Sequence, residues 1–381
     1  MSSVALPTQH AAVLYGAKDL RYEQRALWPP QPDQAQVQVM ATGLCGSDLH
    51  YYAHGRNGDF ALRAPLVLGH EAAGIVTSVG AGVKNLVPGQ RVAIEAGIMC
   101  TNCHYCKSGR YNLCKDLRFA SSAKTFPHLD GTLQERMNHP AHVLHPLPDS
   151  CTFEQAALAE PLSVLVHAGR RAHLSEGQTV LVFGAGAIGI LACALAKARG
   201  ARRVVAVDIN QARLAFAKDN GFADQVFCLP AASKPKTPEE ALLRAKESGD
   251  RILDKFEQAD GFDVVFECTG AEPCIQMAIH TAVTGGKLML IGMGTRSTTI
   301  QLSAAALREV DIMGSFRYAN TYPEALELLG SGKLPNLDKL VTHRFALEDT
   351  ARAFDLVSRG ADEHGRMVLK VMIGPASSSA Q

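Results

Sequence analysis

The chain contains the stretch Val180-Leu-Val-Phe-Gly-Ala-Gly-Ala-Ile-Gly189. Four apolar residues of strand type precede glycines in the spacing G-x-G-x-x-G, and an apolar run of helical type follows. The first glycine permits a tight turn, the second lets a pyrophosphate approach the backbone, and the third lets the helix pack closely on the strand. The anion would rest on free N–H groups at the helix N-terminus. The stretch therefore predicts a dinucleotide site at Gly184, Gly186 and Gly189.

An acidic residue in the expected place supports this interpretation. Asp208 ends the next apolar run, 19 positions after Gly189, where its carboxylate can accept hydrogen bonds from ribose hydroxyls and repel a 2′-phosphate. NAD is therefore favoured over NADP. Arg213 is evidence for NADP, since an arginine can accommodate that phosphate. Alternatively, Arg213 packs near the adenine or pairs with Asp208. A glycine turn that serves only the fold is the competing interpretation of the motif.

The predicted secondary structure changes at Thr179. From Arg21 to about Pro148, short β-like runs are broken by Gly and Pro, which predicts a mostly β domain. After Thr179, apolar strand cores alternate with helical patterns, which is typical of a parallel, doubly wound sheet covered on both faces. The charged segment Pro235–Asp260 is expected to be a solvated crossover helix. A last β run at Met367–Val371 indicates that the chain's end returns to the first domain.

Composition excludes several function classes. The 381 residues are 47% hydrophobic and 20% charged, with a formal net charge of +1, so neither disorder nor nucleic-acid binding is expected. The uncharged run Val180–Ala196 has nearly the length of a membrane span, but its glycines fit a strand, a turn and a helix better. Because no leader pattern precedes His10, we expect a cytoplasmic protein with no membrane partner.

Four of the ten cysteines form one short lobe: Cys100, Cys103, Cys106 and Cys114. Four soft ligands this close suit a closed tetrahedral zinc site that stabilises a loop and does no chemistry. An iron–sulfur cluster is the rival, but the bacterial ferredoxin run places its fourth cysteine three residues on and before a proline, whereas here seven residues intervene and Lys115 follows. Free buried thiols are a further alternative.

A second, looser set combines different donor types: Cys45, His70 with Glu71, and Glu160. Mixed sulfur, nitrogen and oxygen ligands with one open position are the arrangement of a catalytic zinc that polarises an oxygen. Taken singly, these residues are more often a buried thiol, a core imidazole and surface acids. Spacing alone does not join them.

These motifs together resemble the zinc-dependent medium-chain dehydrogenases, within them the polyol branch of sorbitol, xylitol and L-arabinitol dehydrogenases. The resemblance runs from about Ala11 to Ile373. Besides the glycine motif and the cysteine lobe, it is carried by Cys45-Gly-Ser-Asp-Leu-His-Tyr51, Gly69-His-Glu-Ala-Ala-Gly74, Gly89-Gln-Arg-Val92, Glu160-Pro-Leu-Ser163 and Phe316-Arg-Tyr318. The fold that it implies is α/β: a GroES-like, mostly β catalytic domain over 1–163, rejoined by 304–381, and a Rossmann domain with a doubly wound parallel sheet over 164–303.

The resemblance also implies roles for residues. Two zinc ions per chain are expected, with the catalytic zinc held by Cys45, His70 and an acid, either Glu71 directly or Glu160. Substrate contacts are expected from Tyr51, Phe119, Glu160, Arg317 and Tyr318, and a proton relay from Ser47 through a ribose hydroxyl to His50. Besides the three glycines, cofactor contacts are expected from Ile188, Asp208, Arg213, Ile291, Gly292, Met293, Ser315, Phe316 and Arg317.

The implied reaction is reversible oxidation of a secondary hydroxyl of a polyol to a ketose with NAD, in a homotetramer. The segment between Phe119 and Gly131 is longer than the family's usual pocket loop, which leaves the identity of the substrate open. The same chemistry on another secondary or amino alcohol is one alternative. A catalytically silent NAD-binding protein on the same fold is another.

Overall fold

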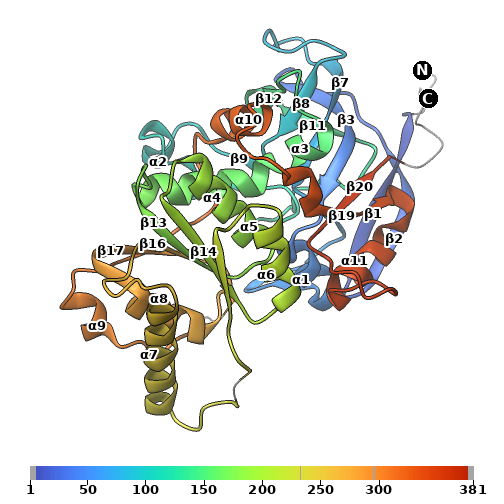
Figure 1. Ribbon diagram of the computed structural model, residues 1–381. Helices are drawn as coiled ribbons and strands as arrows, with labels where there is room; N and C mark the ends of the chain where they lie inside the picture. The colour runs from blue at the N-terminus through green and yellow to red at the C-terminus, as the bar shows by residue number, and fades with distance from the viewer. Residues whose placement is uncertain (1–5, 232, 295–296, 376–381) are drawn as a thin grey trace, which may run out of the picture. The chain divides into compact units, whose positions relative to one another are not determined.

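The computed structural model describes residues 6–231, 233–294 and 297–375, which form two compact units (Figure 1). The first unit comprises the N-terminal part up to Glu160, together with Tyr322–Gly332 and the described residues from Leu337 onward. The second comprises Pro161–Thr321 and Lys333–Asn336. Residues 1–5, which bear on the expectation about a leader, lie outside the described part of the chain.

The second unit is built on a six-stranded parallel sheet. Its strands are β13 (Thr179–Phe183), β14 (Arg203–Asp208), β15 (Gln225–Cys228), β16 (Phe262–Glu267), β17 (Ala282–Leu290) and β18 (Asp311–Gly314). The spatial order is β15-β14-β13-β16-β17-β18, so the direction of winding reverses between β13 and β16. In open α/β sheets, ligands bind beyond the carboxyl ends of the strands at this switch point. The predicted doubly wound parallel sheet is confirmed.

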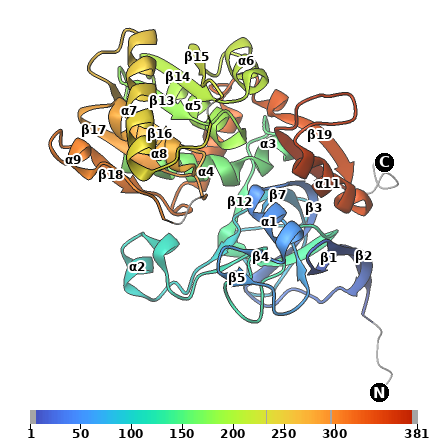
Figure 2. The same ribbon diagram turned by 90° about the horizontal axis from the view of Figure 1, so that it is seen from below.

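Helices cover this sheet because its strands are apolar on both faces; all five residues of β13 are buried. The helices are α5 (Ala187–Ala198), α6 (Gln211–Asp219), α7 (Pro238–Lys255), α8 (Glu272–Thr281) and α9 (Leu302–Ala306). The predicted charged crossover helix is α7, which begins after a Thr237 cap and lies beside α8 (Figure 2). The uncharged run from Val180 is strand, turn and helix, and no helix in the described ranges is long and apolar enough to cross a membrane.

The first unit is mostly β. Its seven-stranded sheet has the order β12-β8-β7-β3-β20-β19, with β11 also paired to β3. These strands are β3 (Gln34–Gly43), β7 (Glu71–Val79), β8 (Arg91–Ile94), β11 (Arg136–Pro140), β12 (Leu144–Pro146), β19 (Val341–Ala346) and β20 (Lys370–Gly374). Smaller sheets are made by β1 (Thr8–Gly16), β2 (Asp19–Ala26), β4 (Arg56–Asn57), β5 (Phe60–Ala61), β6 (Leu66–Val67), β9 (Gly97–Ile98) and β10 (Arg118–Phe119).

The end of the chain completes the first unit, because β20 pairs with β3. The helices here are α1 (Gly46–His54), α2 (His104–Lys107), α3 (Phe153–Ala157), α10 (Tyr322–Gly330) and α11 (Thr350–Arg359), and α4 (Ala159–Arg171) leads into the second unit. The last strand begins later than predicted: β20 begins at Lys370, three residues after the predicted start at Met367. The amides of Val368 and Leu369 bond to the Gly360 carbonyl and the Thr342 hydroxyl instead of to a ladder.

Candidate active site

Three predicted metal ligands meet in the first unit. One ligand atom each from Cys45, His70 and Glu71 lies within 4.8 Å of the others, although 25 positions separate the cysteine from the histidine. Cys45 sits just before α1, His70 directly precedes β7, and Glu71 is the first residue of β7. Gly69 makes this turn with φ +92°, where a Cβ would crowd Thr132 and Thr42. A thiol, an imidazole and a carboxylate at this separation fit a zinc ion with a further coordination position.

Asp48 holds this group in place, a role that the sequence did not reveal. It is completely buried, and one carboxylate oxygen accepts from the His70 Nδ1 at 3.2 Å, the Gly69 amide and the Ser121 hydroxyl. Burial alone would raise the pKa of Asp48, but His70 and these donors outweigh it and lower that pKa. A carboxylate on Nδ1 fixes the imidazole ring and leaves Nε2 for a metal.

Lys370 is the second unforeseen member of the site. Its Nζ donates to both oxygens of Glu71, at 2.9 and 2.7 Å, and to the Leu44 carbonyl at 3.2 Å. Burial would lower the pKa of this lysine, but the charges of Glu71 and Cys45 outweigh it and raise that pKa. A lysine directly followed by Val, Met and Ile in one strand was the sequence signal for a buried partner.

The other residues predicted to serve substrate or proton transfer are placed as follows. Tyr51 is 2% exposed, and its hydroxyl accepts from the Ala123 amide at 2.9 Å. The ring centroid of Phe119 lies 5.5 Å from that of His70. Glu160 is buried at the start of α4 but is not one of the three donors within 4.8 Å. Ser47 is half-buried and His50 exposed, both on α1.

Arg317 and Tyr318 lie in the second unit. Arg317 has φ +50°, in the left-handed region, with its guanidinium carbon 5.0 Å from the Phe316 ring centroid, and Tyr318 is 2% exposed. Holding a non-glycine residue in this region costs about 1 kcal/mol or more, so the surrounding structure enforces it. Their contact with substrate stays a prediction.

The four-cysteine lobe is a second candidate metal centre. One Sγ from each of Cys100, Cys103, Cys106 and Cys114 lies within 4.8 Å of the others. Hydrogen bonds from the amides of Asn102 and Cys103 lower the pKa of Cys100 to about 7, which favours the thiolate that a metal requires. The group fits a closed tetrahedral zinc site.

Replacing Cys114 by serine is expected to lower the zinc content from about two ions per chain to about one, because a closed four-thiolate site does not tolerate loss of a ligand. Cys151 offers a matched control, since it is equally buried and belongs to the same unit but to neither metal group. Metal analysis of the purified variants checks this. An unchanged zinc content in Cys114→Ser would contradict the assignment of the lobe.

The glycine turn of the second unit has the geometry that a dinucleotide needs. Gly184 has φ +98° directly after β13, and a Cβ at Gly189 would overlap the Gly184 carbonyl oxygen. A Cβ at Gly186 would meet nothing closer than the Arg213 guanidinium, at 3.9 Å. Asp208 ends β14, and its carboxylate accepts from the amides of Ala185 and Asn210 at 2.6 and 2.8 Å.

Most of these residues, though not Gly189, line a cavity of about 1160 Å³ that continues toward α7 and α8. Its wall includes Gly184, Gly186, Asp208, Ile209, Arg213 and Thr269. Ile188, Ile291–Met293 and Ser315–Arg317, also predicted to contact the cofactor, are not part of this wall as the described residues form it. The amides of Ile291 and Gly292 both donate to the Glu267 carbonyl, while the Glu267 carboxylate accepts from the Thr269 and Gly270 amides. Glu267 thus ties together two loops at the carboxyl edge of the sheet.

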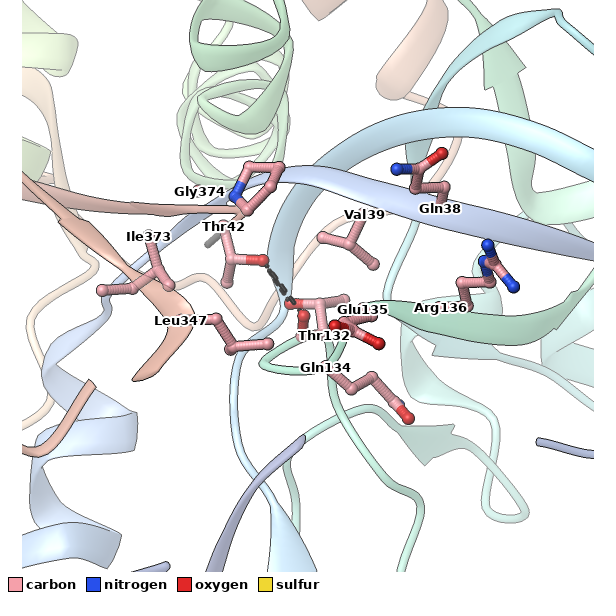
Figure 3. A pocket seen from close by; sticks show the side chains of 11 residues that line it. Gln38, Val39, Thr42, Thr132, Gln134, Glu135, Arg136, Leu347, Ile373 and Gly374 are labelled. Carbon is pink, nitrogen blue, oxygen red and sulfur yellow. Dashed lines mark hydrogen bonds between the residues drawn. The ribbon is translucent and has the colours of Figure 1, made fainter. Parts of the chain in front are cut away.

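A smaller cavity of about 180 Å³ lies in the first unit, between β3, β20 and the segment around Thr132 (Figure 3). The Thr42 hydroxyl approaches both the Thr132 carbonyl, at 3.3 Å, and its hydroxyl, at 3.1 Å. None of the predicted site residues lines it. It is therefore distinct from the metal group.

Comparison with known proteins agrees with this geometry. Residues 31–149 match the alcohol dehydrogenase GroES-like domain, and residues 187–331 match the zinc-binding dehydrogenase model. The chain is 44% identical over 375 residues to sorbitol dehydrogenase of Macaca fascicularis, covering 98% of each. It is 39% identical to L-idonate 5-dehydrogenase of Vitis vinifera, covering 92% of each. The solved L-idonate 5-dehydrogenase of Escherichia coli superposes with a TM-score of 0.84 at 27% identity, covering 97% of this chain and 98% of that one.

A GroES-like β unit with a mixed-donor metal group and a Rossmann unit with its glycine turn define a class of zinc- and NAD-dependent oxidoreductases. The chain belongs to the zinc-dependent medium-chain dehydrogenases, in the branch that contains the sorbitol dehydrogenases. The resemblance seen in the sequence is thereby confirmed, as is the α/β fold class.

Proposed function

We propose that the protein reversibly oxidises a secondary hydroxyl of a polyol of the sorbitol, xylitol or L-arabinitol type to a ketose with NAD. The observation that carries the proposal is the group of Cys45, His70 and Glu71, with His70 oriented by buried Asp48. Zinc, when bound, supplies Lewis acidity toward the substrate oxygen, and the nicotinamide supplies the hydride acceptor. Sorbitol dehydrogenases at 42–44% identity support a polyol as the substrate class.

The chain's own residues would orient the substrate and move its proton. Ser47 and His50 are three positions apart on α1, so they share one helix face. Ser47 is half-buried and His50 exposed, so Ser47 would take up the proton within the site and His50 would release it to solvent. Bound NAD would supply the ribose hydroxyl of this relay. We assign contacts with the substrate to Tyr51, Phe119, Glu160, Arg317 and Tyr318.

The proposal extends to cofactor choice and assembly. Asp208 would accept the ribose hydroxyls and disfavour a 2′-phosphate, which makes NAD the cofactor. The first unit would act as the catalytic domain and the second as the NAD-binding domain. The segment 304–321, expected in the catalytic domain, lies in the second unit, because its strand β18 pairs with β17. We further propose a homotetramer in the cytoplasm.

The test is the initial rate of NADH formation with D-sorbitol, xylitol, L-arabinitol, galactitol and 2-propanol, with NAD and NADP in parallel. We expect rapid turnover of at least one polyol with NAD and poor turnover of 2-propanol, because site groups that pair with several hydroxyls are left unpaired by a plain alcohol. Cys45→Ser is the control that should abolish the rate. If every polyol failed while the protein held about two zinc ions and bound NADH, the long segment after Phe119 would point to another secondary or amino alcohol.

A further inference from the structure

Lys370 is a buried cation whose hydrogen-bonding capacity is fully used. Only 4% of the residue is exposed, and its strand neighbours Val371 and Met372 are buried as well. An ammonium group has three N–H donors, and the three acceptors within reach are the two Glu71 oxygens and the Leu44 carbonyl. Because a buried charge is costly unless it is paired, this lysine depends on Glu71 to remain inside.

The Glu71 carboxylate can interact with two cations, the catalytic metal and the Lys370 ammonium. Its carboxylate belongs to the group that fits a metal, and the same carboxylate accepts from Lys370 through both oxygens. A carboxylate has about four lone-pair positions, so it can accept from the lysine and still ligate. Gly43 leaves the space that this requires, since a Cβ there would overlap a Glu71 oxygen.

We propose that Lys370 is a positioning residue that weakens the bond between Glu71 and the catalytic metal, and so sets how tightly this site holds zinc. The inference rests on the metal site of the proposed function. A fixed positive charge against Glu71 repels a dication and occupies lone pairs that the metal would otherwise share. Of the three candidate ligands, Glu71 is the one whose ligand atoms accept hydrogen bonds from Lys370, so the carboxylate is the ligand under competition.

The test compares zinc affinity in Lys370→Met, which keeps the length of the side chain but removes its charge, with that in Lys370→Arg, which keeps the charge. We expect Lys370→Met to tighten zinc binding at this site by about 10- to 100-fold, the range in which partners of metal ligands act. Lys370→Arg should stay within about threefold of the wild type, because it keeps a positive charge against Glu71. Titration of the zinc-depleted chain against a competing chelator measures this, and the four-cysteine lobe serves as an internal reference.

A second readout separates this role from simple support of the fold. Without zinc, Lys370→Met leaves Glu71 buried and unpaired, so the zinc-depleted variant should unfold at a temperature lower by on the order of 10 °C. Zinc should recover most of that loss, because the metal then neutralises the carboxylate. A residue that only supports the fold would lower the stability of both forms equally. With Co²⁺ in place of zinc, the visible spectrum should change in Lys370→Met and not in Lys370→Arg.

If Lys370→Met does not fold, the proposal can be tested with the double variant Glu71→Gln/Lys370→Met, in which both partners are neutral. Glu71→Gln should bind zinc more weakly than the wild type, and adding Lys370→Met to it should raise the affinity again by removing the repelling charge. Equal or weaker zinc binding on removal of Lys370 would overturn the proposal. Uptake of a single zinc by the wild type, in the cysteine lobe alone, would instead overturn the metal site and the proposed function with it.

Discussion

Replacing Gly189 by alanine is expected to cost the second unit about 2 kcal/mol or more of stability and to abolish measurable NADH binding. The added Cβ would overlap the Gly184 carbonyl oxygen, a backbone atom that cannot rotate away. The start of α5 must then move from the carboxyl end of β13, and the amides that would receive the pyrophosphate move with it. Thermal unfolding and titration of NADH fluorescence measure the two effects.

Gly186→Ala is the matched variant, because it adds the same methyl group two residues from Gly184 in the same turn. The φ of Gly186 is −77°, which alanine adopts freely, and beyond its neighbours in the turn the new Cβ would meet only the Arg213 guanidinium, at 3.9 Å. Stability should therefore stay within about 0.5 kcal/mol of the wild type, while NADH binding weakens because the methyl lies where the pyrophosphate approaches the backbone. If Gly189→Ala and Gly186→Ala were equally stable, the close helix–strand contact would not be what requires Gly189.

The second unit could be predicted closely because its signals are local. A strand, the glycine spacing, a helix and an acid after the next strand all lie within 29 residues, and each has a separate physical cause. The same locality revealed the cysteine lobe. Element ends were less predictable: the β pattern from Met367 continues into a strand that begins only at Lys370, since tertiary partners take the amides of Val368 and Leu369.

The catalytic group could be only half predicted. Residue types suggested Cys45, His70 and Glu71 as zinc ligands, but a resemblance to a family was needed to join them. The partners that fix them are distant in sequence: Ser121 is 73 positions from Asp48, and Lys370 is 299 positions from Glu71. The pair of Glu71 and Lys370 depends on β20 pairing with β3. The β run near Met367 predicted that the chain's end returns to this unit, but not which residue it would bring to Glu71. Tyr51 is likewise contacted by a segment that is distant in sequence: the amide of Ala123, in the segment after Phe119, donates to its hydroxyl.

His70→Ala is expected to remove one of about two zinc ions per chain and to reduce turnover of the polyol by at least about a thousandfold. The imidazole is the nitrogen donor of the group, and its ring is held by Asp48 at 3.2 Å, so no other side chain in that group replaces it. Loss of a metal's Lewis acidity costs several kcal/mol in the transition state, and about 1.4 kcal/mol is tenfold in rate. Metal analysis and initial rates on the same preparation measure both.

His139 separates this effect from the loss of any buried histidine in the first unit. It is 1% exposed, its Nε2 lies 2.8 Å from the Glu95 carbonyl, and burial lowers its pKa to about 4, so it is a neutral core imidazole. His139→Ala should lower stability through the cavity it leaves, yet retain both zinc ions and turnover within a few fold. If His70→Ala kept two zinc ions, or if His139→Ala lost one, His70 would not be the ligand. Because both substitutions remove a buried ring from the same unit, only a difference in zinc content and rate, and not a difference in stability, identifies the metal ligand.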